Sequence, residues 1–224
     1  MENELSNEGR KPSHGPINEK DFLLFRDFVN DKCGILIPPE KAYLIETRLT
    51  KLMLSVGADT FGEFYAYLSS HPFSPLTQKI INAITTHETF WFRDVSPWKL
   101  LEDVLMPRLV EELASGKKIR ARIWSSAVST GQEIYSTVMC IDNYLAKNRV
   151  FGVDLSCFDF FATDISSDSL EIARRGRYDS ISIMRGLDDH YKSKYFVKTG
   201  SAWDLDPRIR NAVRDRKSVV RERV

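Results

Sequence analysis

The sequence contains few cysteines and no long hydrophobic run, and both absences exclude classes of protein. Its three cysteines, Cys33, Cys140 and Cys157, are odd in number and widely spaced, which fits neither a disulfide framework nor a zinc knuckle. We interpret them as buried, reduced thiols and regard a catalytic cysteine as the weaker alternative. Nowhere do about 18 apolar residues run together, and residues 1 to 21 are polar, so neither a membrane-spanning helix nor a secretory signal is predicted.

An excess of charge of one sign is missing as well. The 224 residues include 32 Lys and Arg and 31 Asp and Glu, a formal net charge of +1. This balance gives no electrostatic reason to expect a nucleic-acid or membrane-surface partner. Hydrophobic residues make up 42% and charged residues 28%, as in a folded globular protein. We therefore expect a cytoplasmic protein without membrane insertion.

The first third of the chain is helical in pattern. Residues 1 to 18 are rich in Asn, Glu, Gly, Pro and Ser and predict a flexible leader. Apolar residues then recur at helical spacing in four segments, which begin near Glu19, after Pro38 and Pro39, after the capping-box pair Thr60 and Glu63, and at Ser74 and Pro75. Residues 19 to 85 are therefore predicted to form an all-α N-terminal helical domain.

From residue 86 onward the pattern alternates between helix and strand. A helix from about Ser96 to Leu113 precedes the strand IRARIWS, a helix through Tyr135, the strand DFFATD and a short helix that ends at Gly176. Elements of these lengths in this order predict a parallel α/β sheet. Only two strands are clear, so we expect an incomplete, Rossmann-like α/β domain over residues 86 to 213. A β-subdomain is expected to start at about residue 178, and the charged segment RDRKSVVRERV (214 to 224) is predicted to fit no strand.

The stretch WSSAVSTGQE follows the first predicted strand and opens the next helix. In open parallel sheets, ligands bind beyond the carboxyl ends of the strands. The small residues here allow close approach of a ligand, and Glu133 adds a carboxylate near the helix start. That acid disfavours a phosphate and favours a cationic ligand group. The alternative is a turn of small residues that serves packing alone.

Asp164 ends the second predicted strand, where nucleotide-binding α/β proteins place the acid that accepts hydrogen bonds from ribose hydroxyls. The G-x-G-x-x-G fingerprint of dinucleotide sites is missing. A ligand with a ribose, an ammonium group and no pyrophosphate remains, and S-adenosylmethionine is the commonest such cofactor. The alternative is that Asp164 is a neighbour of a helix N-cap.

A third motif, TTHETFWFRD (85 to 94), lies between the helical part and the α/β part. Arg93 could bind a carboxylate at two points, and Phe90, Trp91 and Phe92 could form an apolar wall. The alternatives are core aromatic residues and a surface ion pair between Arg93 and Asp94.

These strings occur in an order that resembles the CheR-type chemoreceptor methyltransferases. The resemblance covers about residues 22 to 213 and rests on GILIPPEKAYLIETRL, TTHETFWFR, RIWSSAVSTGQEIYS and FATDISSDSLEIARRGRY. It implies transfer of a methyl group from S-adenosylmethionine to glutamate side chains of receptor cytoplasmic helices, with formation of methyl esters. It also implies a monomer that uses no metal and has S-adenosylhomocysteine as its product.

The resemblance assigns roles to single residues. It implies that Thr89 and Arg93 line the cofactor pocket, that Arg93 also lies near the transferred methyl group as the catalytic residue, that Glu133 binds the ammonium and that Asp164 binds the ribose. His87 stands where the family usually has Asn, and a neutral imidazole can still donate one hydrogen bond. Lys41, Arg48 and Lys51 occupy the stretch that faces the receptor, although a solvated helix face explains these charges nearly as well.

The family continues beyond this pattern with further strands and an Asn- and Tyr-bearing segment that closes the pocket. From the sequence we therefore expect an active parent protein and a weak or inactive fragment with an exposed sheet edge. Two other classes of function stay open at this stage. One is a methyltransferase that acts on small molecules, and the other is a receptor-docking protein without catalytic activity.

Overall fold

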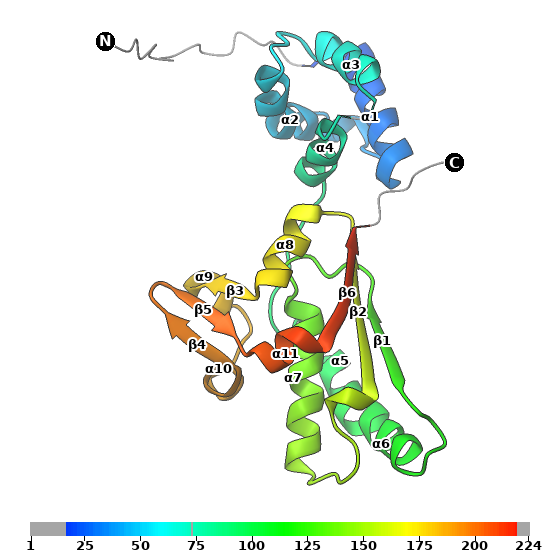
Figure 1. Ribbon diagram of the computed structural model, residues 1–224. Coiled ribbons are helices and arrows are strands. Elements are labelled where there is room, and N and C mark those ends of the chain that lie inside the picture. Colours follow the sequence, from blue (N-terminus) through cyan, green and yellow to red (C-terminus); the bar gives the residue numbers. More distant parts are fainter. Residues whose placement is uncertain (1–16, 73, 219–224) are drawn as a thin grey trace. The chain divides into compact units, whose positions relative to one another are not determined.

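The computed structural model describes residues 17–72 and 74–218, with side chains described as far as residue 213. The chain divides into two compact units, residues 1–84 and 85–224. Each unit is described separately below, with the elements labelled in Figure 1. The segment predicted as a flexible leader lies almost entirely outside the described residues.

The first unit is helical, as the sequence predicts. Its elements are α1 (Glu19–Cys33), the short 3₁₀ helix η1 (Pro39–Lys41), α2 (Tyr43–Ser55), α3 (Phe61–Ser70) and α4 (Leu76–Ile84). The helix α1 ends at Gly34, which adopts the left-handed conformation (φ 74°) and donates its backbone N–H to the carbonyl oxygen of Asn30. The apolar positions at helical spacing form one buried core that includes Phe25, Leu49, Phe64 and Ile80.

The predicted capping box begins α3. The Thr60 hydroxyl accepts the Glu63 backbone N–H at 3.2 Å, and the Glu63 carboxylate accepts the Thr60 backbone N–H at 3.3 Å. We expect Thr60→Ala to lower the free energy of unfolding of this unit by about 1 kcal/mol, because one helix-terminal donor loses its acceptor. Urea denaturation followed by circular dichroism measures the change. Thr47 is exposed in the middle of α2, and Thr47→Ala is the control variant. We expect it to lower the free energy of unfolding by less than Thr60→Ala does.

The second unit is built around a parallel sheet. The strand β1 (Ala121–Ser125) pairs in parallel with β2 (Phe158–Asp164), and α7 (Gln132–Lys147) joins them. Before β1 the chain forms α5 (Val95–Leu100), a π-helical segment η2 (Leu101–Leu105) and α6 (Met106–Ala114). Alternate residues of β2 are buried, and its apolar ones pack with α7 and Met106 into a single core. The prediction of a parallel α/β sheet is confirmed.

A third strand joins this sheet, which corrects one expectation. Residues Val213–Ser218 form β6, which lies parallel to β2 on the side away from β1, as Figure 1 shows. The segment after Val213 was predicted to fit no strand because its sequence has no apolar alternation. Strand pairing uses backbone hydrogen bonds, and charged residues are common on edge strands, so composition alone could not exclude a strand here.

A small antiparallel subdomain lies between α8 (Ser167–Arg175) and β6 in the sequence. It contains β3 (Arg177–Asp179), α9 (Ser180–Met184), α10 (Asp189–Tyr195), β4 (Phe196–Thr199) and β5 (Ala202–Leu205), and α11 (Pro207–Ala212) leads out of it. Its sheet has the order β3-β5-β4. The strands β4 and β5 pair antiparallel and are joined by a tight turn at Gly200.

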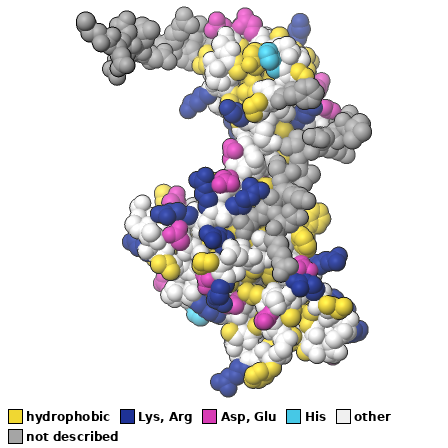
Figure 2. Space-filling model, in the orientation of Figure 1, with side chains coloured by type: hydrophobic (Ala, Val, Ile, Leu, Met, Phe, Trp, Pro, Cys, Tyr) yellow, Lys and Arg dark blue, Asp and Glu magenta, His cyan; other side chains and the backbone are white. Residues whose placement is uncertain are grey.

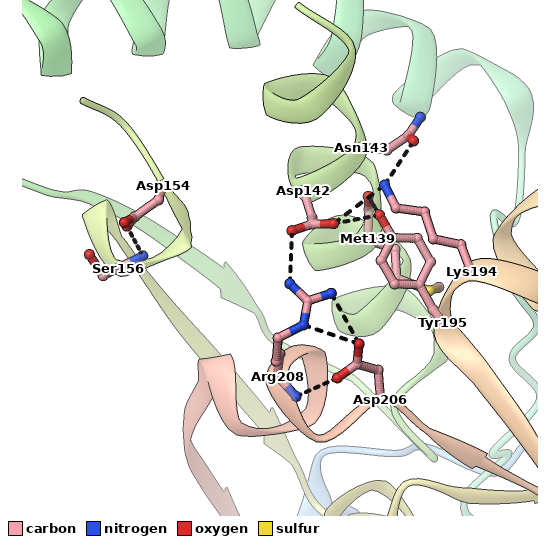
Figure 3. A network of polar contacts seen from close by, with 9 residues as sticks. All are labelled: Met139, Asp142, Asn143, Asp154, Ser156, Lys194, Tyr195, Asp206 and Arg208. Carbon is pink, nitrogen blue, oxygen red and sulfur yellow. Dashed lines mark hydrogen bonds and ion pairs between the residues drawn. The ribbon is translucent and has the colours of Figure 1, made fainter. Parts of the chain in front are cut away.

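A polar network fixes this subdomain to α7 (Figure 3). The Tyr195 hydroxyl donates to the Asp142 carboxylate at 2.7 Å, and Lys194 and Arg208 approach the same carboxylate at 3.5 and 3.7 Å. Arg208 also pairs with Asp206 at 3.0 Å. Burial and the neighbouring Asp142 raise the pKa of Tyr195, so its hydroxyl stays a donor. One carboxylate of α7 therefore holds residues on both sides of β4 and β5.

The surroundings of the buried Cys140 disfavour a nucleophilic thiolate. All three are free; Cys140 is buried, whereas Cys33 and Cys157 are half-buried, so the prediction of burial is confirmed for Cys140 alone. The Cys140 thiol donates to the Glu102 carboxylate at 3.3 Å. Burial, together with that nearby carboxylate, raises the pKa of Cys140 well above its usual range, and this disfavours a thiolate nucleophile.

Candidate functional site

The loop between β1 and α7 is held against the end of β2 by a set of short contacts. The backbone N–H of Val128 donates to the Thr163 carbonyl at 3.1 Å, and the Thr163 hydroxyl donates to the Ser126 carbonyl at 3.2 Å. Because β1 and β2 are parallel, this loop and the residues after Asp164 meet at the carboxyl edge of the sheet. This is the edge at which the sequence predicted a ligand.

Asp164 joins two loops at this edge. Its side chain is 8% exposed, and one carboxylate oxygen accepts the Ser129 backbone N–H at 2.7 Å. The other oxygen accepts the Ser166 backbone N–H at 2.8 Å, and Ser166 in turn caps α8. Asp164 is thus a neighbour of the α8 N-cap, as the alternative interpretation has it, and Ser166 is the cap itself. A carboxylate oxygen can accept more than one hydrogen bond, so a ribose hydroxyl can still be bound.

Ser129 is the residue whose importance the sequence did not reveal. It is buried, and it is one of few non-glycine residues with a left-handed backbone (φ 49°). Its backbone N–H contacts Asp164, and its hydroxyl donates to the His87 carbonyl at 2.8 Å. Ser129 therefore brings together two predicted site residues that are distant in sequence. Apart from its position among small residues, no sequence signal distinguished it.

Glu133 lies in the first turn of α7, where the positive end of the helix dipole attracts a carboxylate. Its carboxylate accepts a hydrogen bond from the Ser125 hydroxyl at 2.7 Å, and the Glu133 side chain is exposed. Gly131 precedes the helix with φ 99°, and an added Cβ would lie 2.8 Å from the Tyr135 ring. The glycine thus permits the close turn that places Glu133 beside the last residue of β1.

The motif TTHETFWFRD is anchored to the second unit mainly by Trp91, which is fully buried. The Trp91 ring nitrogen donates to the Ser182 carbonyl at 3.1 Å, and its backbone N–H donates to the Arg185 carbonyl at 3.1 Å. The Trp91 ring packs edge-on against Tyr178 and Phe196. The interpretation of Trp91 as part of a ligand-facing wall is therefore wrong, since its ring belongs to the core.

The same segment carries local backbone strain. Phe92 and Asp94 have positive φ angles of 48° and 60°, a conformation that side chains with a Cβ rarely adopt. The Phe92 backbone N–H donates to the buried Ser136 hydroxyl at 3.1 Å, which helps to hold the turn. Arg93 lies between these two strained residues. A strained backbone persists only where the surrounding packing imposes it, and strained residues cluster at functional sites.

Arg93 points away from the core and is exposed. Its guanidinium lies 5.6 Å from the centre of the Phe90 ring and donates to the Glu88 carbonyl at 3.5 Å. The Arg185 guanidinium lies 5.5 Å from the same ring and pairs with the Glu88 carboxylate at 2.7 Å. Sequence reasoning missed Arg185 because it is separated from this motif by most of the α/β unit.

The two remaining pocket candidates lie on the same motif. The His87 ring nitrogen Nε2 is 2.8 Å from the Thr85 hydroxyl, and the His87 backbone carbonyl contacts Ser129. Thr89 is half-buried. The structure thus joins His87, Ser129 and Asp164 by direct contacts and joins Glu133 to the end of β1, while Arg93 is grouped with Phe90 and Glu88.

The docking candidates of the first unit differ in exposure. Lys41 and Lys51 are exposed. Arg48 is half-buried and donates to the carbonyl oxygens of Ala83 and Ile84 at 3.4 and 2.6 Å. It thus supplies a hydrogen-bond donor to the last carbonyl groups of α4. If Arg48 contacts a receptor, it must do so while it keeps its hydrogen bonds to the end of α4.

Basic side chains also gather over α8 and β3, on the face shown in Figure 2. In this part of the chain lie Arg174 and Arg175 of α8, Arg177 of β3, and Arg210 of α11, whose guanidinium donates to the Arg175 carbonyl at 3.4 Å. Glu171 lies within 3.7 Å of Arg174 and 3.1 Å of Arg175, and Asp204 lies 3.6 Å from Arg177. These ion pairs partly neutralise the patch. The near-zero net charge of the chain therefore conceals a local excess of arginine.

Among the described residues, no group of three or more His, Cys, Asp or Glu side chains is arranged to hold a metal ion. Among the helices of residues 17–72 and 74–218, none is long and apolar enough to cross a membrane.

Known proteins match both units of the chain. The family model described as the CheR methyltransferase all-alpha domain matches residues 20–85, and the one described as the CheR methyltransferase SAM binding domain matches residues 87–222. The chemotaxis protein methyltransferase Cher2 of Pseudomonas putida is 37% identical over 194 residues, which cover 86% of this chain and 69% of the relative. The chain belongs to the CheR methyltransferase family.

Other relatives agree with this assignment. Chemotaxis protein methyltransferase 1 of Pseudomonas aeruginosa is 38% identical over 194 residues, with the same coverage of 86% and 69%. The chemotaxis protein methyltransferase of Vibrio parahaemolyticus is 33% identical over 184 residues, which cover 82% of this chain and 64% of the relative. The CheR match extends beyond Val213, into the segment that was predicted to lie outside the domain.

Membership in the CheR family confirms the fold class and the enzyme class. An all-alpha domain precedes a domain that binds S-adenosylmethionine (SAM), and the protein is a methyltransferase. The local chemistry fits this cofactor. At the carboxyl edge of β1 and β2 the chain presents the exposed carboxylate of Glu133 beside a loop of small residues. A cationic ammonium group is complementary to that carboxylate, whereas a pyrophosphate would be repelled.

Proposed function

We propose that this chemotaxis methyltransferase transfers methyl groups from S-adenosylmethionine to glutamate side chains on the cytoplasmic helices of chemoreceptors, forming methyl esters. The observation that carries the proposal is membership of both units in the CheR family, together with two acids at one edge of the sheet, Glu133 and Asp164. The chemotaxis role comes from relatives with 37% and 38% identity.

Within this proposal Glu133 binds the cofactor's ammonium group and Asp164 binds its ribose, as the position of both acids at the carboxyl edge of the sheet favours. His87 and Thr89 complete the pocket through the motif that Ser129 ties to Asp164. When bound, S-adenosylmethionine supplies an electrophilic methyl group on its sulfonium sulfur.

The proposed roles of the protein residues in the transfer are modest. A substrate glutamate has an ordinary pKa of about 4.3, so it is ionised at neutral pH and needs no general base. Arg93 is exposed and charged, and it is proposed to hold this carboxylate in line with the methyl group. The chain therefore acts by positioning and by excluding water, without a catalytic triad and without a metal.

The proposed partner is the helical bundle in the cytoplasmic part of a receptor. Lys41 and Lys51 are exposed on the first unit and are proposed to contact the bundle, with Arg48 contributing only beside its contact with α4. An acidic helical surface is complementary to such a set. The protein would then act as a monomer in the cytoplasm.

Transfer of radiolabelled methyl groups tests the proposal. The purified chain is incubated with labelled S-adenosylmethionine and a cytoplasmic receptor fragment that carries glutamate at its methylation positions. Because Glu133 and Asp164 both lie at the carboxyl edge of a sheet that β6 extends, we expect, in contrast to the expectation from the sequence alone, label on the fragment that is released by mild base, as methyl esters require. A fragment with glutamine at those positions is the control. Label that enters only small molecules, or label that resists base, would contradict the proposal.

A further inference from the structure

Two arginines share one aromatic ring beside the proposed substrate position. The guanidinium carbons of Arg93 and Arg185 lie 5.6 and 5.5 Å from the centre of the Phe90 ring. A cation over an aromatic face is attracted by the ring, which restricts where each flexible side chain lies. Phe90 thus gathers two positive charges that come from distant parts of the sequence.

An internal carboxylate occupies the space near these two charges. The Glu88 carboxylate accepts a hydrogen bond from Arg185 at 2.7 Å. This contact, with a smaller effect from Arg93, lowers the pKa of Glu88 below its usual range, so Glu88 is ionised at neutral pH. The Glu88 carboxylate therefore already pairs with Arg185, while the Arg93 guanidinium donates to the Glu88 backbone carbonyl at 3.5 Å.

The pairing of Glu88 with Arg185 is open to exchange. The side chains of Arg185 and Glu88 are 49% and 63% exposed. Exposed ion pairs are weak, because solvent screens them and both side chains lose freedom. A second carboxylate can therefore reach Arg185 from solution and can displace Glu88 at little cost.

The backbone under this cluster is fixed, in contrast to its side chains. The Arg185 carbonyl accepts the Trp91 backbone N–H at 3.1 Å, and the Ser182 carbonyl accepts the Trp91 ring N–H at 3.1 Å. Gly186 packs so closely that an added Cβ would lie 2.0 Å from the Trp91 carbonyl oxygen. The loop that carries Arg185 and the motif that carries Arg93 are thus positioned by the core, while their charged ends remain accessible.

We propose that Arg93 and Arg185 form a two-arginine carboxylate site around Phe90, and that Glu88 occupies this site until an acidic side chain of the protein substrate replaces it. Arg185 is thereby a specificity residue for acidic acceptors, and Glu88 is a built-in competitor. The inference rests on the proposed function, since it assumes a glutamate-bearing substrate.

The two residues should have opposite effects on substrate binding. Arg185→Gln removes a charged donor, and we expect it to weaken binding of the glutamate-bearing receptor fragment about tenfold. Glu88→Gln removes the competitor, and we expect it to strengthen binding by about threefold, the scale of an exposed ion pair. Arg185→Lys keeps the charge but not the planar fork, and we expect it to recover part of the loss.

Fluorescence titration measures the affinity, with the full chain, saturating S-adenosylhomocysteine and the labelled receptor fragment. The same fragment with glutamine at the methylation positions should bind wild type and Arg185→Gln equally, because its neutral acceptor makes no ion pair. Arg177→Gln is the matched control, since Arg177 is an exposed arginine of the same subdomain that pairs with Asp204. We expect wild-type affinity from it, and wild-type melting temperatures from all variants.

Two results would overturn the proposal: equal affinity of wild type and Arg185→Gln for the glutamate fragment, or weaker binding by Glu88→Gln. A wild type that does not bind the fragment at all would overturn it too. Failure of the proposed function is recognised separately, by the absence of base-labile methyl transfer from wild type. If methyl transfer is found while the variants bind alike, only the arginine-pair inference fails.

Discussion

Gly186→Ala is expected to lower the free energy of unfolding of the methyltransferase unit by about 3 kcal/mol. Gly186 has a left-handed backbone (φ 86°), which costs alanine roughly 1–2 kcal/mol. Its new Cβ would also lie 2.0 Å from the Trp91 carbonyl oxygen, and overpacking of this kind costs about 1–3 kcal/mol. Because Trp91 cannot stay in place, the segment with Thr89 and Arg93 must shift, and cofactor binding should fall with stability.

Urea denaturation gives the stability, and titration with S-adenosylhomocysteine gives the binding. Gly152→Ala is the matched control, because Gly152 has a similar φ of 76° but nothing within 4 Å of an added Cβ. Gly152→Ala should lose only the part of the free energy of unfolding that is due to backbone strain. If Gly186→Ala and Gly152→Ala were equally stable, the close contact between Gly186 and Trp91 would not exist as described.

Asp164→Ala is expected to reduce both stability and cofactor binding, the former by about 3 kcal/mol. The buried carboxylate accepts the backbone N–H groups of Ser129 and Ser166, and each buried donor left without an acceptor costs about 1–3 kcal/mol. Ser129 also has a strained backbone (φ 49°), so loss of its anchor should release the loop and its contact with His87. The proposed ribose contact is lost as well.

Denaturation and S-adenosylhomocysteine titration again measure the two effects. Asp164→Asn keeps one carbonyl acceptor, and we expect it to lose about half as much stability as Asp164→Ala. Asp168→Asn, at an exposed position in the first turn of α8, serves as the control and should change little. A fully stable Asp164→Ala variant would show that the two loops are not held by this carboxylate.

Local features of the sequence predicted much of the fold. The capping box at Thr60 and the helix end at Gly176 were readable because they depend on residues close together in the chain. The strands β1 and β2 and the intervening helix α7 were readable from hydrophobic periodicity. In contrast, β6 has a charged sequence and was missed, because its place depends on a partner strand.

The candidate site was predictable only in part. The positions of Glu133 and Asp164 followed from strand ends, since parallel strands end at a common edge. Contacts between distant residues left no local signal: Arg185 meets Glu88 across 97 positions, and Ser129 meets Asp164 across 35. Trp91 was misread for the same reason, because nothing near it in the sequence indicates that its ring is buried by β3 and β4.

The most direct test of the account is a calorimetric titration of S-adenosylhomocysteine into the wild-type chain and into Glu133→Gln. The account predicts one binding site in wild type and at least about tenfold weaker binding in Glu133→Gln, because a charged hydrogen bond to the ammonium is lost. Glu171→Gln, an exposed substitution on α8, should bind as wild type does. Equal affinity of wild type and Glu133→Gln, or no binding by wild type, would contradict the claim that the carboxyl edge of β1 and β2 forms the cofactor site.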